Sequence, residues 1–290
     1  MRVFITGLTG TLGTALAKLH AERGDEVVGC ARGEANAAAW LREHGHLGKL
    51  LIGDAADAGD WQTPVGGALL MSDRVYHCAA MKHVDLCEAN VTEAVHQNVE
   101  VTRRVATACA RSGTPLVFVS SDKACLPGGV YGATKLIGER LVIGMGGAAV
   151  RLGNLLGSSG SVFHVWRRQA EAGGPIKVTD PSMTRYFMRV SDAAAFVADG
   201  HVPRQVRMPY GMRAAHLGYM ASAISLKYGV GTEVVGRRPG ETGHQWLVAP
   251  DERYTHEDGA IVLGGASGSI GISSEAGPWW GADELLEAVA

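Results

Sequence analysis

Short apolar runs of strand length alternate with longer segments of helical period through the first 121 residues. In chain order the strands are predicted at 3–6, 26–31, 49–54, 74–80 and 115–121, and the helices at 14–23, 36–45 and 93–112. This order is typical of βαβ units, in which parallel strands form a sheet and helices cover both of its faces. The N-terminal half is therefore predicted to be a doubly wound α/β domain.

Composition and charge narrow the possible roles. The 290 residues are 46% hydrophobic and 19% charged, which is enough for one large domain or two small ones with a substantial core. The net charge of −2 gives no basic surface for nucleic acid or for an anionic membrane. No apolar run approaches the ~20 residues needed to cross a bilayer, and the first residues enter a strand without a signal-peptide pattern. We expect a cytoplasmic protein.

The cysteines and histidines form no recognisable disulfide or metal pattern. The cysteines are odd in number, contain no CxxC pair and fall mostly in apolar runs: Cys30, Cys78, Cys87, Cys109 and Cys125. They are predicted to be free thiols that pack as small hydrophobic side chains. His44 and His46 have no third ligand at a suitable spacing, so they are expected on the surface and no metal site is predicted.

The first strand runs directly into TGLTGTLG, which places Gly7, Gly10 and Gly13 before the first predicted helix. Glycines let the backbone turn tightly and approach a pyrophosphate, whose charge then lies at the helix N-terminus. Because strand, glycine loop and helix follow in the required order, the sequence predicts a dinucleotide site rather than a chance spacing. The other loop residues expected to contact the cofactor are Thr9, Thr11 and Leu12.

The end of the second strand distinguishes the two nicotinamide cofactors. An acid there binds the ribose hydroxyls of NAD, whereas a basic residue meets the 2′-phosphate of NADP. The sequence GCARGE lacks an acid at the expected position and has Arg32 just beyond it, which favours NADP. Arg32 as a solvated loop charge, with Glu34 serving NAD, is the alternative. Asp54 ends the third strand and is expected either to accept from the adenine amino group or to cap a helix.

Two proton-transfer groups stand four residues apart in VYGATK, where Tyr131 and Lys135 lie on one face of a predicted helix. The Lys135 ammonium is expected to lower the pKa of the Tyr131 phenol and to hold the nicotinamide ribose, so that the phenolate removes a proton from a sugar hydroxyl. This pair follows a strand that ends in two serines and lies downstream of the glycine loop. In that context it resembles the extended short-chain dehydrogenase/reductase superfamily, which implies a Rossmann sheet and a smaller C-terminal substrate domain.

Five longer segments follow one another in order: AAMKHVDLCEAN (79–90), SSDKACLPGGVYGATKLIGE (120–139), RLGNLLGSSGSV (151–162), TDPSMTRYFM (179–188) and RRPGETGH (237–244). Together they resemble the UDP-N-acetylglucosamine 4,6-dehydratases of polysaccharide biosynthesis, from residue 1 to about residue 250. The resemblance implies an NADP-dependent lyase that removes water from a UDP-N-acetylhexosamine and recycles its cofactor in each turnover. It also implies a homo-oligomer, either a dimer or a hexamer.

The resemblance gives each residue of the SSDK segment a role. Tyr131 would remove the proton of the carbon 4 hydroxyl, to which Ser121 would hydrogen-bond. The ketone so formed acidifies the proton on carbon 5, which Lys123 would remove, and Asp122 would protonate the hydroxyl that leaves carbon 6. The alternative for an Asp-Lys pair after a strand is a solvated turn.

The same resemblance implies further contacts to the sugar nucleotide and the cofactor. Lys82 and His83 follow the fourth strand at its carboxyl end, where ligands bind in such sheets, although His83 as a structural residue stays open. Substrate contacts are expected from Asn154 on the sugar or a phosphate oxygen, from Thr184 and Arg185 on the diphosphate, from Arg238 and Glu241 on phosphate and uridine ribose, and from Ser161, Val162, Thr179 and Met183. Further cofactor contacts are expected from Ala55, Ala79, Ala80, Lys82 and Asn98.

The chain departs from the family pattern at Val91, Ser159, Thr242 and Gln245, which leaves the identity of the sugar open. Beyond residue 251 the resemblance fades, and the Gly/Ser-rich stretch 264–280 is expected to be a mobile tail. Its pair of tryptophans is expected to dock onto the body or onto a neighbouring subunit. Two alternatives to the dehydratase remain: a UDP-sugar epimerase, which needs no Asp-Lys pair, and a non-catalytic NADP-binding regulator.

Domain boundaries and stereochemistry follow from the resemblance. Residues 1–154 and about 188–202 are expected to form the nucleotide-binding domain, and about 155–187 and 203–290 the substrate domain. Inversion at carbon 5 is also predicted, because soluble members of the family that invert keep Tyr at the position of Tyr131. Membrane-anchored members that retain the configuration tend to carry Met there.

Overall fold

The computed structural model describes the chain apart from residues 159–160, 265–270, 282–283, 285–286 and 288–290. Ser159 and part of the Gly/Ser-rich stretch therefore lie outside the described residues. The strands are β1 (Arg2–Thr6), β2 (Glu26–Ala31), β3 (Lys49–Ile52), β4 (Arg74–His77), β5 (Leu116–Ser121), β6 (Ala148–Leu152), β7 (Asn154–Leu155), β8 (Ile176–Val178), β9 (Thr184–Met188), β10 (Val206–Pro209), β11 (Arg213–His216), β12 (Thr232–Val234), β13 (Trp246–Val248), β14 (Tyr254–Glu257), β15 (Ala260–Leu263) and β16 (Ile272–Ser273). The helices are α1 (Thr11–Glu22), α2 (Glu34–His44), α3 (Pro64–Leu70), α4 (Val84–Ala89), α5 (Val91–Val95), α6 (Val101–Ser112), α7 (Val130–Gly144), α8 (Val162–Glu171), α9 (Val190–Asp199) and α10 (Leu217–Tyr228), with short helical turns η1 (Gly45–Leu47), η2 (Ala55–Gly59), η3 (His96–Glu100) and η4 (Asp122–Ala124).

Within the described residues, the fold is built on a nine-stranded sheet in the order β14-β15-β10-β6-β5-β4-β1-β2-β3. All neighbouring pairs from β10 across to β3 are parallel, whereas β15 is antiparallel to β10 and β14 to β15. The predicted doubly wound parallel sheet is confirmed. β10, β14 and β15 come from the stretch that the sequence analysis gave to the substrate domain, yet they extend this sheet; the division into two domains stays a prediction.

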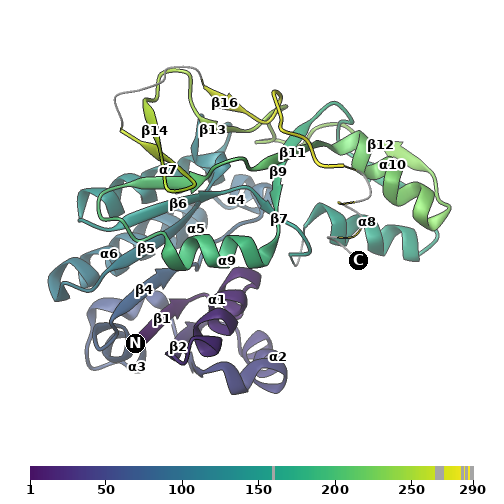
Figure 1. Cartoon of the computed structure of the whole chain (residues 1–290). Helices are drawn as coiled ribbons and strands as arrows, with labels where there is room; N and C mark the ends of the chain where they lie inside the picture. The colour runs from purple at the N-terminus through teal and green to yellow at the C-terminus, as the bar shows by residue number, and fades with distance from the viewer. Residues whose placement is uncertain (159–160, 265–270, 282–283, 285–286, 288–290) are drawn as a thin grey trace.

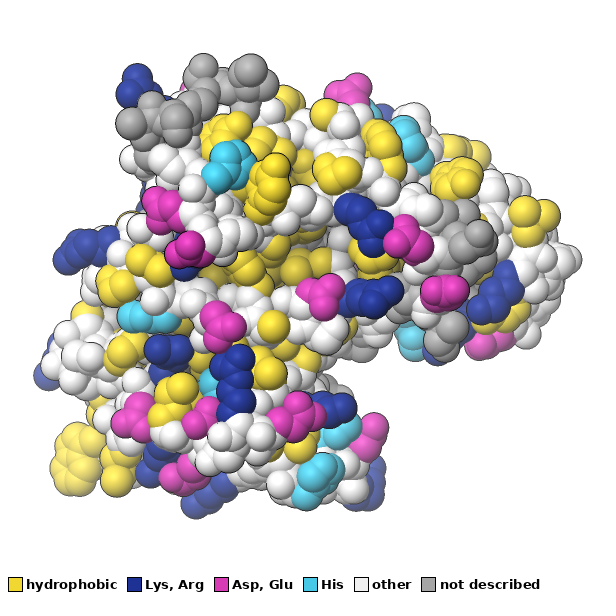
Figure 2. Space-filling model, viewed as in Figure 1, with side chains coloured by type: hydrophobic (Ala, Val, Ile, Leu, Met, Phe, Trp, Pro, Cys, Tyr) yellow, Lys and Arg dark blue, Asp and Glu magenta, His cyan; other side chains and the backbone are white. Residues whose placement is uncertain are grey.

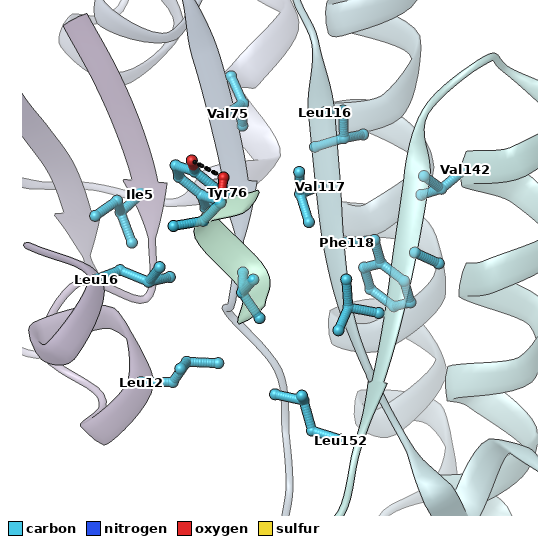
Figure 3. Close-up of a cluster of buried hydrophobic side chains, with 14 of the residues drawn as sticks. Ile5, Leu12, Leu16, Val75, Tyr76, Leu116, Val117, Phe118, Val142 and Leu152 are labelled. Atoms are coloured by element: carbon cyan, nitrogen blue, oxygen red, sulfur yellow. Dashed lines mark hydrogen bonds between the residues drawn. The ribbon is translucent and has the colours of Figure 1, made fainter. Parts of the chain in front are cut away.

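Helices cover the main sheet on both sides, so the side chains on both of its faces are buried and apolar. Val3, Phe4 and Ile5 of β1 are completely buried, as is typical of a parallel strand in the middle of a sheet. α1 packs against α9, and α6 packs against α7. Figure 3 shows side chains of β1, β4 and β5 meeting those of α1 and α7 in this core.

A smaller lobe stands beside the main sheet and has a core of its own. It contains the three-stranded sheet β11-β9-β7, the pair β12-β8, and the helices α8 and α10. Trp166 of α8 is buried in it and donates from Nε1 to the Lys177 carbonyl at 2.8 Å. Figure 1 shows α8, α10 and β12 to the right of the main sheet.

The C-terminal tryptophans dock onto the body of the same chain. Trp280 donates from Nε1 to the carbonyls of Phe187 at 3.1 Å and Arg213 at 3.2 Å, and the Arg213 guanidinium lies 3.9 Å from the centre of its ring. Trp279 stacks on His216 with ring centres 4.7 Å apart. The predicted docking onto the body is confirmed, and it joins the end of the chain to β9 and β11.

The remaining sequence expectations concern thiols and membrane segments. The five cysteines are free; four of them are buried and Cys78 is half-buried, which agrees with their predicted packing role. In the part of the chain that the structure describes, no helix is both long and apolar enough to span a membrane.

Candidate active site

The glycine loop closes tightly at the carboxyl end of β1. Gly7 has a left-handed φ of +69°, and a Cβ there would lie 2.9 Å from Ala79 Cα. A Cβ on Gly13 would lie 2.3 Å from the Gly7 carbonyl oxygen. The loop therefore needs glycine at both positions, and α1 begins at Thr11 directly after Gly10. A tight glycine loop at the N-terminus of a helix fits a dinucleotide pyrophosphate.

Arg32 lies at the adenosine end of the predicted cofactor site. Its Nη1 is 3.8 Å from Asp54 Oδ2 and 3.9 Å from Glu93 Oε1, and its side chain is 55% exposed. Asp54 Oδ1 accepts from the Ala56 amide at 2.9 Å, so the predicted capping alternative for Asp54 is confirmed. The Asn36 side chain, which the sequence analysis missed, also lines the site.

Asn98 supports the cofactor site from behind. It is buried in η3, where its Oδ1 accepts from the Met81 amide at 2.8 Å and its Nδ2 donates to the Met81 carbonyl at 2.9 Å. The same Nδ2 donates to Thr134 Oγ1 of α7 at 3.0 Å. Asn98 does not itself line the cavity, so its predicted cofactor contact is replaced by a role in holding the chain after β4.

Tyr131 and Ser121 meet on the cavity wall. Burial raises the pKa of the Tyr131 phenol, the charge of Asp122 raises it further, and a hydrogen bond with Ser121 opposes both. The expectation that Lys135 lowers this pKa is therefore wrong for the protein alone. Ser121 is the neighbouring group whose hydrogen bond lowers the pKa of the phenol.

The Lys135 ammonium is held against β5. Its Nζ donates to the Val119 carbonyl at 2.5 Å and lies 4.2 Å from the centre of the Phe118 ring. Burial lowers the pKa of Lys135 to about 8. Lys135 thus presents a buried, easily deprotonated amine to the same cavity.

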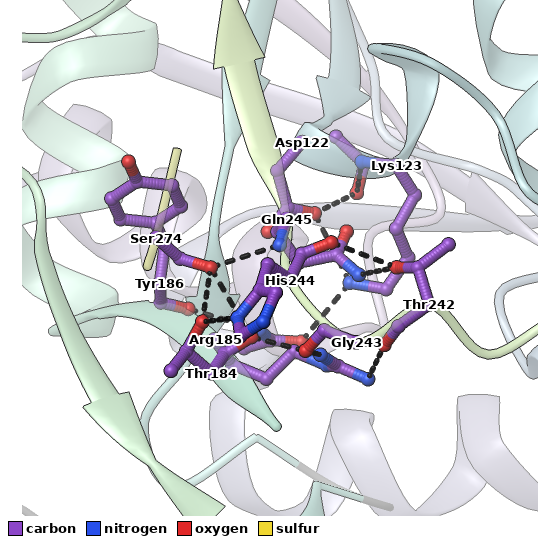
Figure 4. Close-up of polar contacts among 12 residues, drawn as sticks. Asp122, Lys123, Thr184, Arg185, Tyr186, Thr242, Gly243, His244, Gln245 and Ser274 are labelled. Atoms are coloured by element: carbon purple, nitrogen blue, oxygen red, sulfur yellow. Dashed lines mark hydrogen bonds and ion pairs between the residues drawn. The ribbon is translucent and has the colours of Figure 1, made fainter. Parts of the chain in front are cut away.

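Asp122 and Lys123 form a close acid–amine pair in η4, as Figure 4 shows. Asp122 is completely buried, and its Oδ1 accepts from Lys123 Nζ at 3.0 Å and from Ser121 Oγ at 2.9 Å. Its Oδ2 has no hydrogen-bond partner among the described residues. Lys123 Nζ also donates to Asn154 Oδ1 at 3.3 Å. The alternative of a solvated turn is therefore wrong for Asp122.

One cavity of about 1340 Å³ joins the glycine loop, the proton-transfer groups and the smaller lobe. Figure 2 shows the outline indented below the smaller lobe, with acidic and basic side chains interspersed on the visible face. The predicted site residues that line the cavity are Gly7, Thr9, Gly10, Thr11, Leu12, Gly13, Arg32, Asp54, Ala55, Ala79, Ala80, Lys82, His83, Ser121, Lys123, Tyr131, Lys135, Asn154, Ser161, Val162, Thr179, Arg185, Arg238 and Glu241. Those outside its lining are Asn98, Asp122, Met183 and Thr184.

Thr184 and Met183 are buried behind the cavity wall, contrary to the predicted substrate contacts. Thr184 Oγ1 hydrogen-bonds His244 Nδ1 at 2.8 Å and Ser274 Oγ at 2.7 Å (Figure 4). Met183 and Thr184 are completely inaccessible to solvent. The Thr184 hydroxyl is used to join β9 to the C-terminal segment, so it is not available to a diphosphate.

Arg185 lines the cavity, and both of its Nη groups donate hydrogen bonds to the protein. Its Nη1 donates to the carbonyls of Thr184 at 2.8 Å and Gly243 at 3.0 Å, and its Nη2 donates to the Thr242 carbonyl at 2.9 Å. In the protein alone these donors hold residues 235–246, which we call the strap, and the predicted contact of Arg185 with a diphosphate stays a prediction. Most of the strap lines the cavity.

Glu88 is a residue that the sequence analysis missed. Its Oε1 accepts from the Val130 amide at 2.6 Å and so caps α7, the helix that carries Tyr131. A Cβ on Gly240 of the strap, whose φ is +77°, would lie 2.8 Å from the same oxygen. Glu88 therefore joins the strap to the catalytic helix. An acid in a short surface helix carries no sequence signal for such a role.

The residues that the smaller lobe contributes to the cavity were also missed in part. Trp166 and Gln169 of α8 and Lys177 of β8 line it opposite the glycine loop. Their spacing matches an ordinary amphipathic helix and strand, so periodicity alone could not distinguish them. Among the described residues, no group of three or more His, Cys, Asp or Glu side chains is arranged to hold a metal ion.

Comparisons with known proteins agree with this site. The family model described as "Polysaccharide biosynthesis protein" matches residues 3–264. The probable polysaccharide biosynthesis protein EpsC of Bacillus subtilis is 34% identical over 88% of this chain, which spans about half (46%) of EpsC. An inverting UDP-N-acetylglucosamine 4,6-dehydratase of Campylobacter jejuni is 27% identical over 87% of this chain and 78% of its own length. A UDP-glucose 4-epimerase of Rickettsia canadensis is 30% identical over 72% of this chain and 64% of its own length.

A solved structure agrees over the whole fold. The X-ray structure of Pen from Bacillus thuringiensis superposes with a TM-score of 0.90 at 27% identity, covering 99% of this chain and 96% of Pen. The match to the family model spans the glycine loop, α7, the strap and the turn η4 with Asp122 and Lys123, which we call the catalytic turn. This chain belongs to the polysaccharide biosynthesis protein family.

Proposed function

We propose that this protein removes water from UDP-N-acetylglucosamine and forms a UDP-4-keto-6-deoxy-N-acetylhexosamine. The observation that carries the proposal is the Asp122–Lys123 pair, whose Oδ1 and Nζ lie 3.0 Å apart beside the Tyr131 site. Oxidation and reduction at carbon 4 need only a phenol and a nicotinamide. Elimination of the carbon 6 hydroxyl needs an additional base and acid, and this pair supplies both.

NADP is the cofactor that we propose for the glycine loop. The tight loop from Gly7 to Gly13 would hold the pyrophosphate, and the exposed Arg32 would meet the 2′-phosphate. When bound there, NADP would supply the hydride acceptor for carbon 4 and the hydride donor for carbon 6. Lys135 lies in the same cavity and would hold the ribose next to Tyr131.

The proton transfers follow from the positions of the side chains. Tyr131, hydrogen-bonded to Ser121, takes the proton of the carbon 4 hydroxyl. Lys123 lines the cavity and takes the proton of carbon 5 once carbon 4 is a ketone. Asp122 lies outside the cavity lining and accepts from both Lys123 and Ser121, so it would act through Ser121: the Ser121 hydroxyl gives its proton to the leaving hydroxyl and takes up the proton of Asp122. The released water carries the carbon 6 oxygen.

The test is incubation of the purified protein with UDP-N-acetylglucosamine and NADP, followed by mass spectrometry. Loss of one water supports the dehydratase. An unchanged mass with a new epimer contradicts it and identifies an epimerase, and recovery of unchanged substrate contradicts both activities. Because Tyr131 is present, we also propose inversion at carbon 5. An L-arabino product in the first NMR spectra agrees with inversion, and a D-xylo product rejects inversion while leaving the dehydration in place.

A UDP-sugar epimerase is the second candidate, favoured by the similarity to the Rickettsia canadensis UDP-glucose 4-epimerase. An epimerase would use Tyr131 and Lys135 and would not need Lys123 as a base. Substitution of Lys123 by Ala therefore separates the two candidates, because it would leave epimerisation largely intact and would abolish dehydration.

A further inference from the structure

A buried guanidinium lies beneath the catalytic turn. Arg151 of β6 is completely buried and directs all of its N–H groups to protein oxygens. It donates to the Glu139 carboxylate at 2.9 and 3.0 Å, to the Glu252 carboxylate at 3.0 and 3.1 Å, and to the Leu247 carbonyl at 2.9 Å. One cation thus binds two carboxylates in a place where water does not reach it.

Both ends of the catalytic turn are attached to this cluster. Before the turn, Ser120 Oγ donates to Glu139 Oε1 at 2.6 Å. After the turn, Cys125 Sγ donates to Glu252 Oε2 at 3.6 Å. Asp122 and Lys123 lie between these two anchors, so the position of the acid–amine pair depends on the two carboxylates that flank Arg151.

Glu252 brings in a part of the chain that is remote in sequence. Its Oε2 also accepts from the Ala249 amide at 2.9 Å, which closes the turn after β13. The segment 246–253 continues directly from the strap, and Trp246 lines the cavity. Hence the cluster connects the strap that borders the cavity to the turn that carries the acid–amine pair.

The protonation states suit this arrangement. Burial is the largest single influence on the pKa of Glu252 and would raise it, but the hydrogen bonds and charge of Arg151, together with the hydrogen bonds from the Ala249 amide and Cys125, outweigh burial and lower the pKa. Burial raises the pKa of the Cys125 thiol, so the sulfur keeps its proton and serves as a donor. At neutral pH the contact is therefore a neutral S–H against a carboxylate.

We propose that Glu252 is a positioning residue for the Asp122–Lys123 pair, acting through Arg151 and Cys125, and that segment 246–253 is in this way part of the active site. The inference rests on the proposed dehydration for its kinetic test. Its structural test is independent of any substrate.

The kinetic test compares Glu252→Gln with the neighbouring exposed Asp251→Asn. An amide accepts through one atom alone, so Glu252→Gln removes one guanidinium contact whichever oxygen is replaced, and it also removes the contacts to Cys125 and Ala249 if the replaced oxygen is Oε2. We expect kcat for dehydration to fall by about 10- to 100-fold, with KM and NADP affinity within about 2-fold of wild type, because a small displacement of reacting groups has effects of this size. Glu252→Asp keeps the charge and should restore part of kcat. Asp251→Asn should match wild type.

The structural test is hydrogen exchange of the peptide that spans residues 120–127. The Lys123 amide is bonded to Ser121 Oγ at 3.3 Å and the Cys125 amide to the Asp122 carbonyl at 3.1 Å. Glu252→Gln should speed exchange at both, and Asp251→Asn should not. Wild-type kcat per folded molecule together with wild-type exchange in Glu252→Gln would overturn the proposal, whatever its melting temperature. If wild-type protein forms no dehydrated product, the proposed function fails, and the exchange result still decides the positioning role.

Discussion

A buried histidine beneath the cofactor site makes the stability of this protein depend on pH. His77 is the last residue of β4 and is almost completely buried. Its Nε2 is 3.0 Å from Thr102 Oγ1, which donates its own proton to the Asn98 carbonyl at 2.7 Å. His77 Nε2 must therefore be the donor, and its Nδ1 accepts from Thr6 Oγ1 at 2.7 Å. Both ring nitrogens are satisfied in the neutral form.

Burial, followed by the charge of Lys135, lowers the pKa of His77 to about 3. Because the folded pKa lies below the unfolded value of about 6.5, the unfolded chain takes up a proton first as the pH falls. The contribution of His77 is fully present above pH ~6.5 and is lost between pH ~6.5 and ~3. At pH 5 the difference is about 1.5 pH units, or roughly 2 kcal/mol of unfolding free energy at about 1.36 kcal/mol per unit.

The assay is urea unfolding at pH 7.5 and pH 5 of wild type, His77→Gln and the exposed control His46→Gln. Wild type and the control should each lose roughly 2 kcal/mol more than His77→Gln does between these pH values. His20 and His201, whose pKa values are also lowered by burial, are common to all three proteins and cancel in the comparison. An equal loss in wild type and His77→Gln would refute the assignment of a buried neutral His77.

Three further predictions concern the site. Arg32→Ala should remove most of a several-fold preference for NADP over NAD, because a charge-assisted contact contributes about 1.5 to 3 kcal/mol; equal affinities in wild type would contradict this. Tyr131→Phe should slow reduction of bound cofactor by ~10² to 10⁴. Lys123→Ala should slow both solvent deuterium exchange at carbon 5 and dehydration by ~10² to 10⁴. Full dehydration by Lys123→Ala would assign the base elsewhere. Arg185→Lys should lower the free energy of unfolding by roughly 1 to 2 kcal/mol, and with it the melting temperature, since lysine lacks the forked donor geometry. Arg238→Ala should raise KM with little change in melting temperature. The reverse pattern would return Arg185 to the predicted diphosphate site.

Local sequence pattern predicted the architecture because parallel strands leave a local signal. A strand that is buried on both faces reads as a short apolar run, and β1, β2 and β5 were found within one residue of their predicted bounds. Element ends were less accurate. α1 begins at Thr11 and not at the predicted residue 14, and the predicted helix 93–112 is α5, a π-helical turn and α6 in succession. The turn places Asn98 against Met81, a long-range contact that periodicity cannot show.

The catalytic turn shows which part of a site remains inaccessible from sequence. The SSDK segment identified the acid and the amine, but their environment comes from groups far away in the chain. Arg151 contacts Glu252 across 101 positions, and Cys125 contacts the same carboxylate across 127. No local pattern distinguishes these acids and thiols from solvated ones, because their partners are chosen by the packing of β6 against the C-terminal segment.

Arg185 lines the cavity as predicted, but its hydrogen bonds to the protein are a part of its role that the sequence did not reveal. β9 is the middle strand of its sheet, and all five of its residues are buried. Buried polar groups in proteins are almost always hydrogen-bonded to the protein itself, so a guanidinium within such a strand is committed before any ligand arrives. This rule applies to Thr184 as well, whose hydroxyl is bonded to His244 and Ser274. Arg238 of the strap and Lys177 of β8 line the cavity and are exposed. These two cations face the same cavity from the strap and from the smaller lobe, and Arg185 holds the strap through its hydrogen bonds to Thr242 and Gly243.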